Sequence, residues 1–258
     1  MTLPVPGYLA SAHVDDESVR YEWDDWRTLP AAETPDPELV KRLKGVSQRA
    51  VLAFLCGTAE WIYARLGRFC EDPAPGEYLE AAWAIIIDSR YVGYGTADWW
   101  QTYSASEWLG PVKGPIHDAL AGVETAAQQL ALERIDPSFK AARLATLSAY
   151  IMPDPKPYIR WRDQIMDRFE RVYPRRPEDP LGDVVPRQAI DPGFDFRAED
   201  TEALINRFLT ELDHDTNRFL SSPEGMLKGD VDGHFMGTPY RFDIEADRQA
   251  RLGIRTGR

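Results

Sequence analysis

The chain has 258 residues, with 42 acidic and 30 basic side chains and a formal net charge of −12. Proteins that bind nucleic acid by neutralising phosphates normally carry a basic surplus, so this charge argues against that class. Hydrophobic residues make up 43% of the chain, which is enough to bury a substantial core and excludes a wholly disordered protein.

The sequence carries no signal for a membrane or for secretion. Its longest apolar run, residues 81–87, is far shorter than the ~20 residues that a bilayer-spanning helix needs. Residues 1–7 have neither the basic nor the apolar region of a signal peptide. Cys56 and Cys70 are too few to make a disulfide framework. We therefore expect a soluble, cytoplasmic protein.

Residues 1–35 show no regular hydrophobic period and are predicted to form an acidic, aromatic arm. Residues 1–40 hold nine acidic and two basic side chains, a net charge of −7. Val19, Tyr21 and Trp23 alternate with polar residues, which is the pattern of a short strand. The residues of the arm that we predict to bind a partner are Asp15, Asp16, Glu17, Tyr21, Trp23, Asp24, Asp25 and Trp26.

Helical signals dominate residues 36–221, and we predict a mainly α fold in which five to seven helices form one irregular bundle and a single domain. A helix start at Asp36 and Pro37 is followed by an apolar period that lasts to Leu66. Residues 47–66 are apolar enough to be a central, mostly buried helix. Further helices are predicted over residues 77–90, 115–134, 138–151, 158–173 and 201–220.

Three other segments are predicted to be non-helical or mixed. Residues 174–198 are rich in proline and poor in apolar side chains, so we expect a surface loop. Residues 222–258 are expected to form a small β element and a tail, because the segment 226–243 alternates around turn-forming glycines as a hairpin does. Residues 91–110 hold an aromatic loop or two short helices.

Two patterns resemble metal sites but are incomplete. Glu211-x-x-His214 matches half of the motif that binds two irons in helical bundles, and the second copy is missing. The segment Asp230-x-Asp232-Gly233 opens like a calcium loop, but the glycine and the final glutamate of that loop do not follow at the required positions.

The dipeptide His117-Asp118 is one that metal-dependent phosphohydrolases use on a helix. Such sites also need an upstream histidine and a distal aspartate, and upstream of this dipeptide the sequence offers His13 alone. We therefore predict no metal, no cofactor and no catalytic residue.

Glu60 and Glu80 lie within otherwise apolar helices. A buried carboxylate costs free energy unless it is paired, so Glu60 should meet an arginine or mark a polar cavity. The sequence offers Arg65, Arg90 and Arg143 as possible partners. We predict a structural ion pair rather than a functional carboxylate.

The acidity of the chain is concentrated in two segments. Residues 178–218 hold eleven acidic and four basic side chains, a net charge of −7 that equals that of residues 1–40. An acidic surface with aromatic rings suits docking to a basic protein, because charge steers the encounter and rings supply buried anchors. We therefore predict a non-enzymatic acidic binding protein that neutralises a basic partner through the arm.

This profile resembles that of bacterial immunity proteins, which neutralise secreted toxins. The resemblance is one of composition and architecture, so it implies a function but no site residues. Two other functions stay open. A metal-assisted hydrolase would use His117, Asp118 and His214 with nearby acids, whereas a scaffold protein would use the aromatic loop Trp99–Trp108 as an interface between copies.

Overall fold

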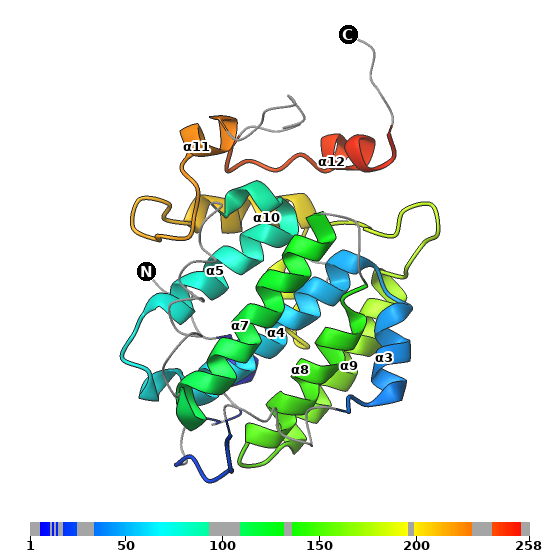
Figure 1. Cartoon of the computed structure of the whole chain (residues 1–258). Coiled ribbons are helices and arrows are strands. Elements are labelled where there is room, and N and C mark those ends of the chain that lie inside the picture. Colours follow the sequence, from blue (N-terminus) through cyan, green and yellow to red (C-terminus); the bar gives the residue numbers. More distant parts are fainter. Residues whose placement is uncertain are drawn as a thin grey trace.

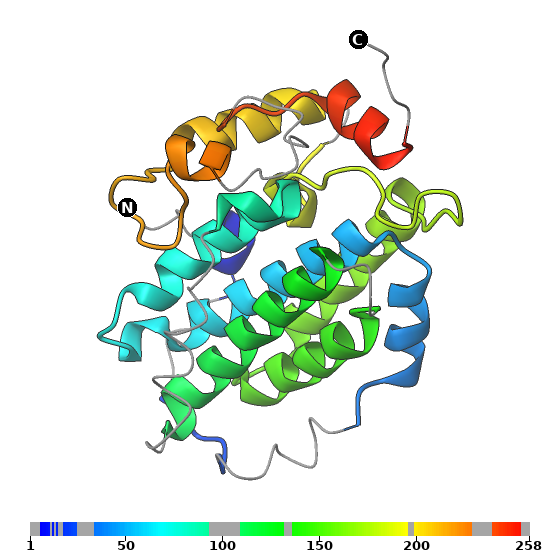
Figure 2. The ribbon, with the colours of Figure 1, turned by 45° about the horizontal axis from the view of Figure 1, so that its top comes forward.

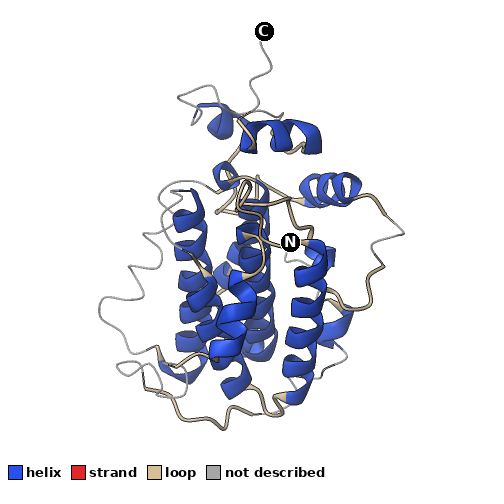
Figure 3. Cartoon of the chain, turned by 90° about the vertical axis from the view of Figure 1, so that its right-hand side faces the viewer, coloured by secondary structure: helices blue, strands red, loops and turns tan. Residues whose placement is uncertain are grey.

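The computed structural model describes residues 6–10, 12, 14, 18–24, 34–92, 109–131, 136–195, 199–228 and 239–253. Within these ranges the regular elements are ten α-helices and three 3₁₀ turns, with no strand (Figure 3). Six of the helices have eleven or more residues. The prediction of a mainly α fold is confirmed. The described residues hold ten helices rather than the five to seven predicted, because four short helices of eight residues or fewer add to the six long ones. No helix in the described ranges is both long and apolar enough to cross a membrane.

The helix α4 (Gln48–Leu66) lies at the centre of the bundle (Figures 1 and 2). Sixteen of its nineteen residues are buried, as expected for a helix that is apolar on all sides. The predicted central, mostly buried helix is confirmed. It begins after Ser47, whose hydroxyl caps it by accepting a hydrogen bond from the Ala50 N–H at 3.3 Å. The helices that contact α4 are α5 (Ala74–Ile87), α7 (Gly110–Ala131), α8 (Ser138–Ile151) and α9 (Lys156–Val172).

The first predicted helix is two helices, α3 (Pro37–Lys44) and α4, separated by residues 45–47. Val46 forms a bridge with Pro174, and the Ser47 N–H donates to the carbonyl oxygen of Tyr173 at 2.9 Å. Gly182, at φ +75°, allows the loop after α9 to approach Ser47. A Cβ at this position would lie 2.3 Å from the Cβ of Ser47. A contact distant in sequence therefore replaces the helical hydrogen bonds at this break.

The helix α10 (Thr201–Glu211) ends earlier than the apolar pattern predicts. The Asp213 carboxylate accepts hydrogen bonds from the N–H groups of Asp215 and Thr216, both at 3.2 Å. A side chain that binds nearby backbone donors competes with the helix, and this local turn stops α10 before Leu220.

The centre of the segment 174–195 is buried, so the predicted surface loop is wrong there. The Trp161 indole N–H donates to the Ile190 carbonyl at 2.8 Å. The Arg168 guanidinium donates to the carbonyls of four residues between Ala189 and Phe194. Because side chains of α9 bind these carbonyls, the backbone can be buried without unsatisfied polar groups. The buried apolar residues are Val184, Val185, Ala189 and Ile190, the last two within η3 (Arg187–Ile190).

The C-terminal β element is not seen in the described residues. Residues Pro223–Lys228 form α11 and residues Ile244–Arg251 form α12, whereas residues 229–238 lie outside the described ranges. The Asp243 carboxylate caps α12 by accepting from the N–H groups of Glu245 and Ala246. The remaining short elements are α1 (Gly7–Ala10), η1 (Gly67–Phe69) and η2 (Ser89–Tyr91).

Two buried arginines connect α12 to the start of α4 and to the loop after α9. Arg49 forms a two-pronged ion pair with Asp247 at 2.8 and 2.9 Å. The Arg251 side chain, 5% exposed, donates to Asp179, Asp183 and Asp247. Because each of these buried guanidinium groups has carboxylate partners, the cluster stabilises the docking of a helix that buries no residue of its own fully.

We predict that Arg251→Met destabilises the protein by about 2–4 kcal/mol, because it leaves the mostly buried Asp179 carboxylate without its ion-pair partner, whereas Asp247 keeps Arg49. The control Arg248→Met lies on the same helix but removes a pair with Glu245 that is about half exposed, and should cost less than about 1 kcal/mol. Urea unfolding of both variants measures the difference. Equal effects would contradict a stabilising role for the cluster.

This stabilisation should also depend on pH. Burial raises the pKa of Asp179, but the hydrogen bonds from Arg251 and the Gly182 N–H, together with the charges of Arg251 and Arg49, outweigh it, so the pKa lies below its ordinary value. A lowered folded-state pKa gives stability that is present above the unfolded pKa of about 4 and is lost as the pH falls through the folded value. The difference between wild type and Arg251→Met should therefore shrink below about pH 4.

Candidate functional site

Residues 18–24 of the arm lie against α4, α7 and α8. Val19, Tyr21 and Trp23 are partly buried, and the polar residues between them are exposed. The predicted alternation is therefore present, although the segment is no strand: it packs on helices. Arg65, 1% exposed at the end of α4, donates to the Ser18 carbonyl at 2.9 Å.

Tyr21 donates a hydrogen bond to a backbone carbonyl of α7 that has no donor within the helix. α7 begins at Gly110, five residues before the predicted start at Pro115, so this proline lies inside the helix. Proline has no N–H, and the carbonyl four residues earlier, that of Pro111, therefore lacks its helical donor. The Tyr21 hydroxyl donates to this carbonyl. Burial raises the pKa of Tyr21, which keeps the hydroxyl protonated as a donor.

Trp23 packs on the same turn of α7. A Cβ at Gly114 would lie 2.4 Å from the Trp23 indole nitrogen, so the missing side chain of this glycine makes room for the ring. The Tyr150 hydroxyl of α8 donates to the Glu22 carbonyl at 3.1 Å, and the Tyr21 and Tyr150 rings meet edge to face with 5.9 Å between centroids. The aromatic residues of the arm thus anchor it to its own bundle.

The acidic residues of the arm are placed only in part. Asp24 is exposed. The other predicted contact residues, Asp15, Asp16, Glu17, Asp25 and Trp26, lie outside the described residues, as does the aromatic loop Trp99–Trp108.

The structure does not bring the candidate metal ligands together. His117 and Asp118 are neighbours on α7, with 4.0 Å between Nδ1 and Oδ1. Because α10 ends at Glu211, His214 is not on the same helix face, and its ring instead lies 4.9 Å from that of Tyr240. Among the described residues no three His, Cys, Asp or Glu side chains are grouped so that they could hold a metal ion. The segment 230–233 and His13 lie outside those residues.

The buried carboxylate of Glu60 accepts hydrogen bonds from three side chains that come from different elements. Its side chain is 6% exposed, in the middle of α4. Oε1 accepts hydrogen bonds from the Arg187 guanidinium and the Trp83 indole N–H, both at 2.8 Å, and Oε2 accepts one from the Tyr8 hydroxyl at 3.3 Å. The predicted pairing with an arginine is confirmed, but the partner is Arg187 of η3 rather than any of the three considered.

Tyr8 connects this carboxylate to a cluster of aromatic rings. Its ring stacks on that of Trp161 and is tilted against that of Trp61, with 6.1 Å between centroids in both pairs. Burial, and then the negative charge of Glu60, raise the pKa of Tyr8. The Glu60 hydrogen bond and the Trp61 contact therefore hold the N-terminal helix α1 over the middle of α4, and the Trp161 contact holds it against α9.

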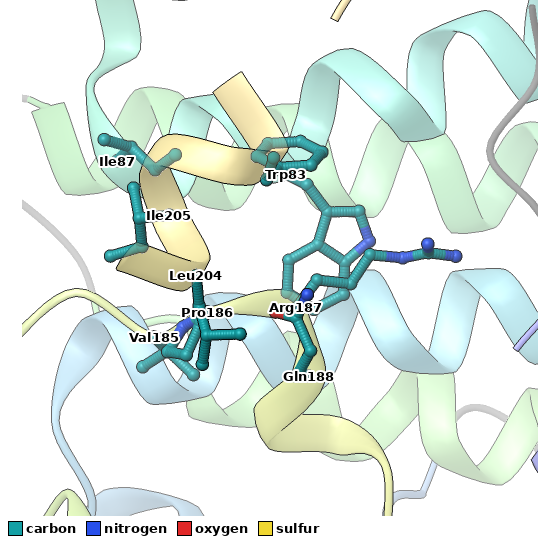
Figure 4. A pocket seen from close by; sticks show the side chains of 9 residues that line it. Trp83, Ile87, Val185, Pro186, Arg187, Gln188, Leu204 and Ile205 are labelled. Atoms are coloured by element: carbon teal, nitrogen blue, oxygen red, sulfur yellow. The ribbon is translucent and has the colours of Figure 1, made fainter. Parts of the chain in front are cut away.

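Beside the Glu60–Arg187 pair, a narrow cleft of about 10 Å³ lies between α5, η3 and α10. In Figure 4 the Trp83 indole of α5 lies next to Arg187, and the other labelled side chains, except Gln188, are apolar. Ligand pockets are typically larger, at about 300–1,000 Å³. The arrangement is that of a buried ion pair with an apolar surround, and it holds η3 in place.

The Glu80 carboxylate is hydrogen-bonded by an amide, whereas the Glu60 carboxylate is paired with an arginine. The Asn217 amide donates to the Glu80 carboxylate at 2.8 Å and to the Glu77 carbonyl at 2.9 Å. Burial raises the pKa of Glu80, and the Asn217 hydrogen bond opposes that shift. Arg218 pairs with the Glu77 carboxylate at 2.7 Å. These bonds fix the turn after α10 on α5.

No protein-family model, no curated protein and no solved structure matches this chain. The function is therefore inferred from the residues and geometry described above.

We predict that Tyr21→Phe destabilises the protein by about 1–2 kcal/mol, because the Pro111 carbonyl loses its donor. In a Pro115→Ala background the restored N–H satisfies that carbonyl, so the same change should cost less than about 0.5 kcal/mol. A double-mutant cycle by urea unfolding gives the coupling between the two positions. A cost of Tyr21→Phe that is the same in both backgrounds would contradict this account of the arm.

We predict that Arg187→Met costs about 2–4 kcal/mol, because it leaves a buried carboxylate without its cation. Adding Glu60→Gln removes the uncompensated charge but keeps an acceptor for Trp83, so the double variant should be more stable than Arg187→Met alone. Arg218→Met, which breaks a pair whose arginine is 53% exposed, serves as the control and should cost little. A double variant less stable than Arg187→Met would overturn this assignment.

Proposed function

We propose that this protein is a non-enzymatic acidic binding protein that blocks a basic protein partner. The observation that supports it best is a group of carboxylates at the end of α10, which we call the acidic turn: Glu211, Asp213 and Asp215. The Asp215 side chain is 88% exposed. Arg207, the exposed cation on the same helix, is already paired with Glu199 at 2.7 Å.

Hydrogen bonds fix the conformation of the acidic turn and keep its Asp213 carboxylate ionised. Hydrogen bonds from Thr216 hold the pKa of Asp213 below its ordinary value, so this carboxylate stays ionised. The carbonyl end of α10 adds the negative end of a helix dipole. Beneath the turn, Asn217 is buried and bonded to Glu80, so the exposed carboxylates rest on an ordered support. A rigid negative surface favours fast, charge-steered association with a basic partner.

The two acidic segments are held by different helices. The arm lies on α7 and α8 through Tyr21 and Tyr150, whereas the acidic turn lies on α5 through Asn217. Because Tyr21 and Trp23 are occupied in holding the arm, the acidic turn is the stronger candidate for the contact surface, with the exposed acids of the arm as a second one. In biological terms the proposal corresponds to an immunity protein that neutralises a basic toxin.

The test is binding to the purified product of a neighbouring gene that encodes a basic protein, measured by calorimetry at about 50 and 150 mM salt. We expect a complex that weakens with salt. Glu211→Lys/Asp215→Lys should weaken it by at least about tenfold, because each reversed charge faces a like charge.

The matched control is Glu71→Lys/Asp163→Lys, which changes the net charge equally but lies outside both acidic segments. It should leave the affinity within about threefold of the wild type. Equal losses in the two double variants would show non-specific attraction and contradict the proposal. If charge reversal at Glu22 and Asp24 abolished binding instead, the contact surface would be the arm rather than the acidic turn. Absence of a complex with every such neighbour would overturn the proposed function.

A further inference from the structure

A groove of about 190 Å³ lies between α7 and α8, two helices that run side by side (Figure 1). A short connection makes consecutive packed helices antiparallel, so the start of α8 lies beside the end of α7. Lys140 and Arg143 of α8 therefore share one end of the groove with Thr125 of α7. Leu147 and Asp118 line the opposite end.

The middle of the groove is lined by apolar residues and by a glycine. Ala121 and Gly122 of α7 form one side and Leu144 of α8 the other. A Cβ on Gly122 would meet nothing closer than the Lys140 Cδ, at 4.0 Å. The missing side chain at this position therefore leaves open space between the helices rather than a tight helix contact.

The two cations at the end of the groove are unusual in this protein. Both are partly buried, and no hydrogen bond or ion pair joins the side chain of either one to an acceptor in the described structure. Burial, and then the charge of Arg143, lower the pKa of Lys140. The other cations with described side chains that lack such a bond are all exposed: Lys44, Lys156, Arg160, Arg171, Arg176 and Arg241.

This arrangement costs free energy in the unbound protein. Two like charges on neighbouring turns of α8 are partly removed from water, and no described carboxylate pairs with either of them. The chain has 42 acidic residues and pairs its other partly buried arginines with carboxylates or carbonyls, as in Arg42, Arg168 and Arg175. A guanidinium and an ammonium that converge on one open groove form the donor set that binds carboxylates and phosphates.

We propose that the α7–α8 groove binds a small amphipathic anion, with its carboxylate or phosphate between Lys140 and Arg143 and its apolar part along Leu144. The bound oxyanion offsets the two desolvated cations and accepts hydrogen bonds from both. Asp118 at the far end repels a second anionic group, so a ligand with one charged head is favoured over a dianion with charges at both ends.

Calorimetric titration of the full chain with octyl phosphate, octanoate and inorganic phosphate tests the proposal. We expect at least one alkyl anion to bind with a Kd below about 1 mM, and inorganic phosphate to bind more weakly because it lacks the apolar part. The better alkyl ligand then identifies the headgroup. Lys140→Gln/Arg143→Gln should weaken binding at least about tenfold.

Two further variants separate binding from folding. Lys156→Gln/Arg160→Gln removes two exposed, unpaired cations from α9 and should leave the affinity unchanged. Gly122→Leu places a side chain in the open middle of the groove and improves helix propensity, so it should abolish binding of the alkyl anions without lowering the melting temperature. No binding of either alkyl anion by the wild type, or equal losses in the two charge-removed variants, would overturn the proposal.

Discussion

A charged group in the middle of the central helix is the constraint on which the rest of the structure depends. The Glu60 carboxylate is buried on α4, where an isolated charge would be very costly. Three donors distant in sequence compensate for it: Tyr8 of α1, Trp83 of α5 and Arg187 of η3. The bundle can therefore close around α4 only when the N-terminal helix, α5 and the loop after α9 reach it together.

The same need explains why a proline-rich segment enters the core. Arg187 can reach Glu60 because Trp161 and Arg168 of α9 bind the carbonyls that follow it. Val185 and Ile190, on either side, are then buried against the central helices. One ion pair thus converts a surface segment into part of the core, since polar backbone groups are tolerated inside only when each finds a partner.

Whether a charged side chain is paired depends on whether it is buried or exposed in this protein. Buried cations meet carboxylates or carbonyls, as Arg49 and Arg251 do at the C-terminal helix. The described carboxylates Glu22, Asp24, Glu211 and Asp215 are left exposed. Against that background the partly buried Lys140 and Arg143 stand out, because they have no partner in the described ranges. The proposed acidic turn and the proposed anion groove lie on separate helices.

Local patterns in the sequence determined the helical class, the helix start at Asp36 and Pro37, the buried central helix, and the need of Glu60 for a cation. Each depends on periodicity, capping or the cost of burying charge, which are properties of neighbouring residues. Tertiary structure alone decided that the cation is Arg187, that Tyr21 satisfies the carbonyl freed by Pro115, and that Lys140 and Arg143 line an open groove. These depend on segments 90 or more residues apart, or on the packing of two helices, and single-sequence patterns carry no information about which distant side chains meet.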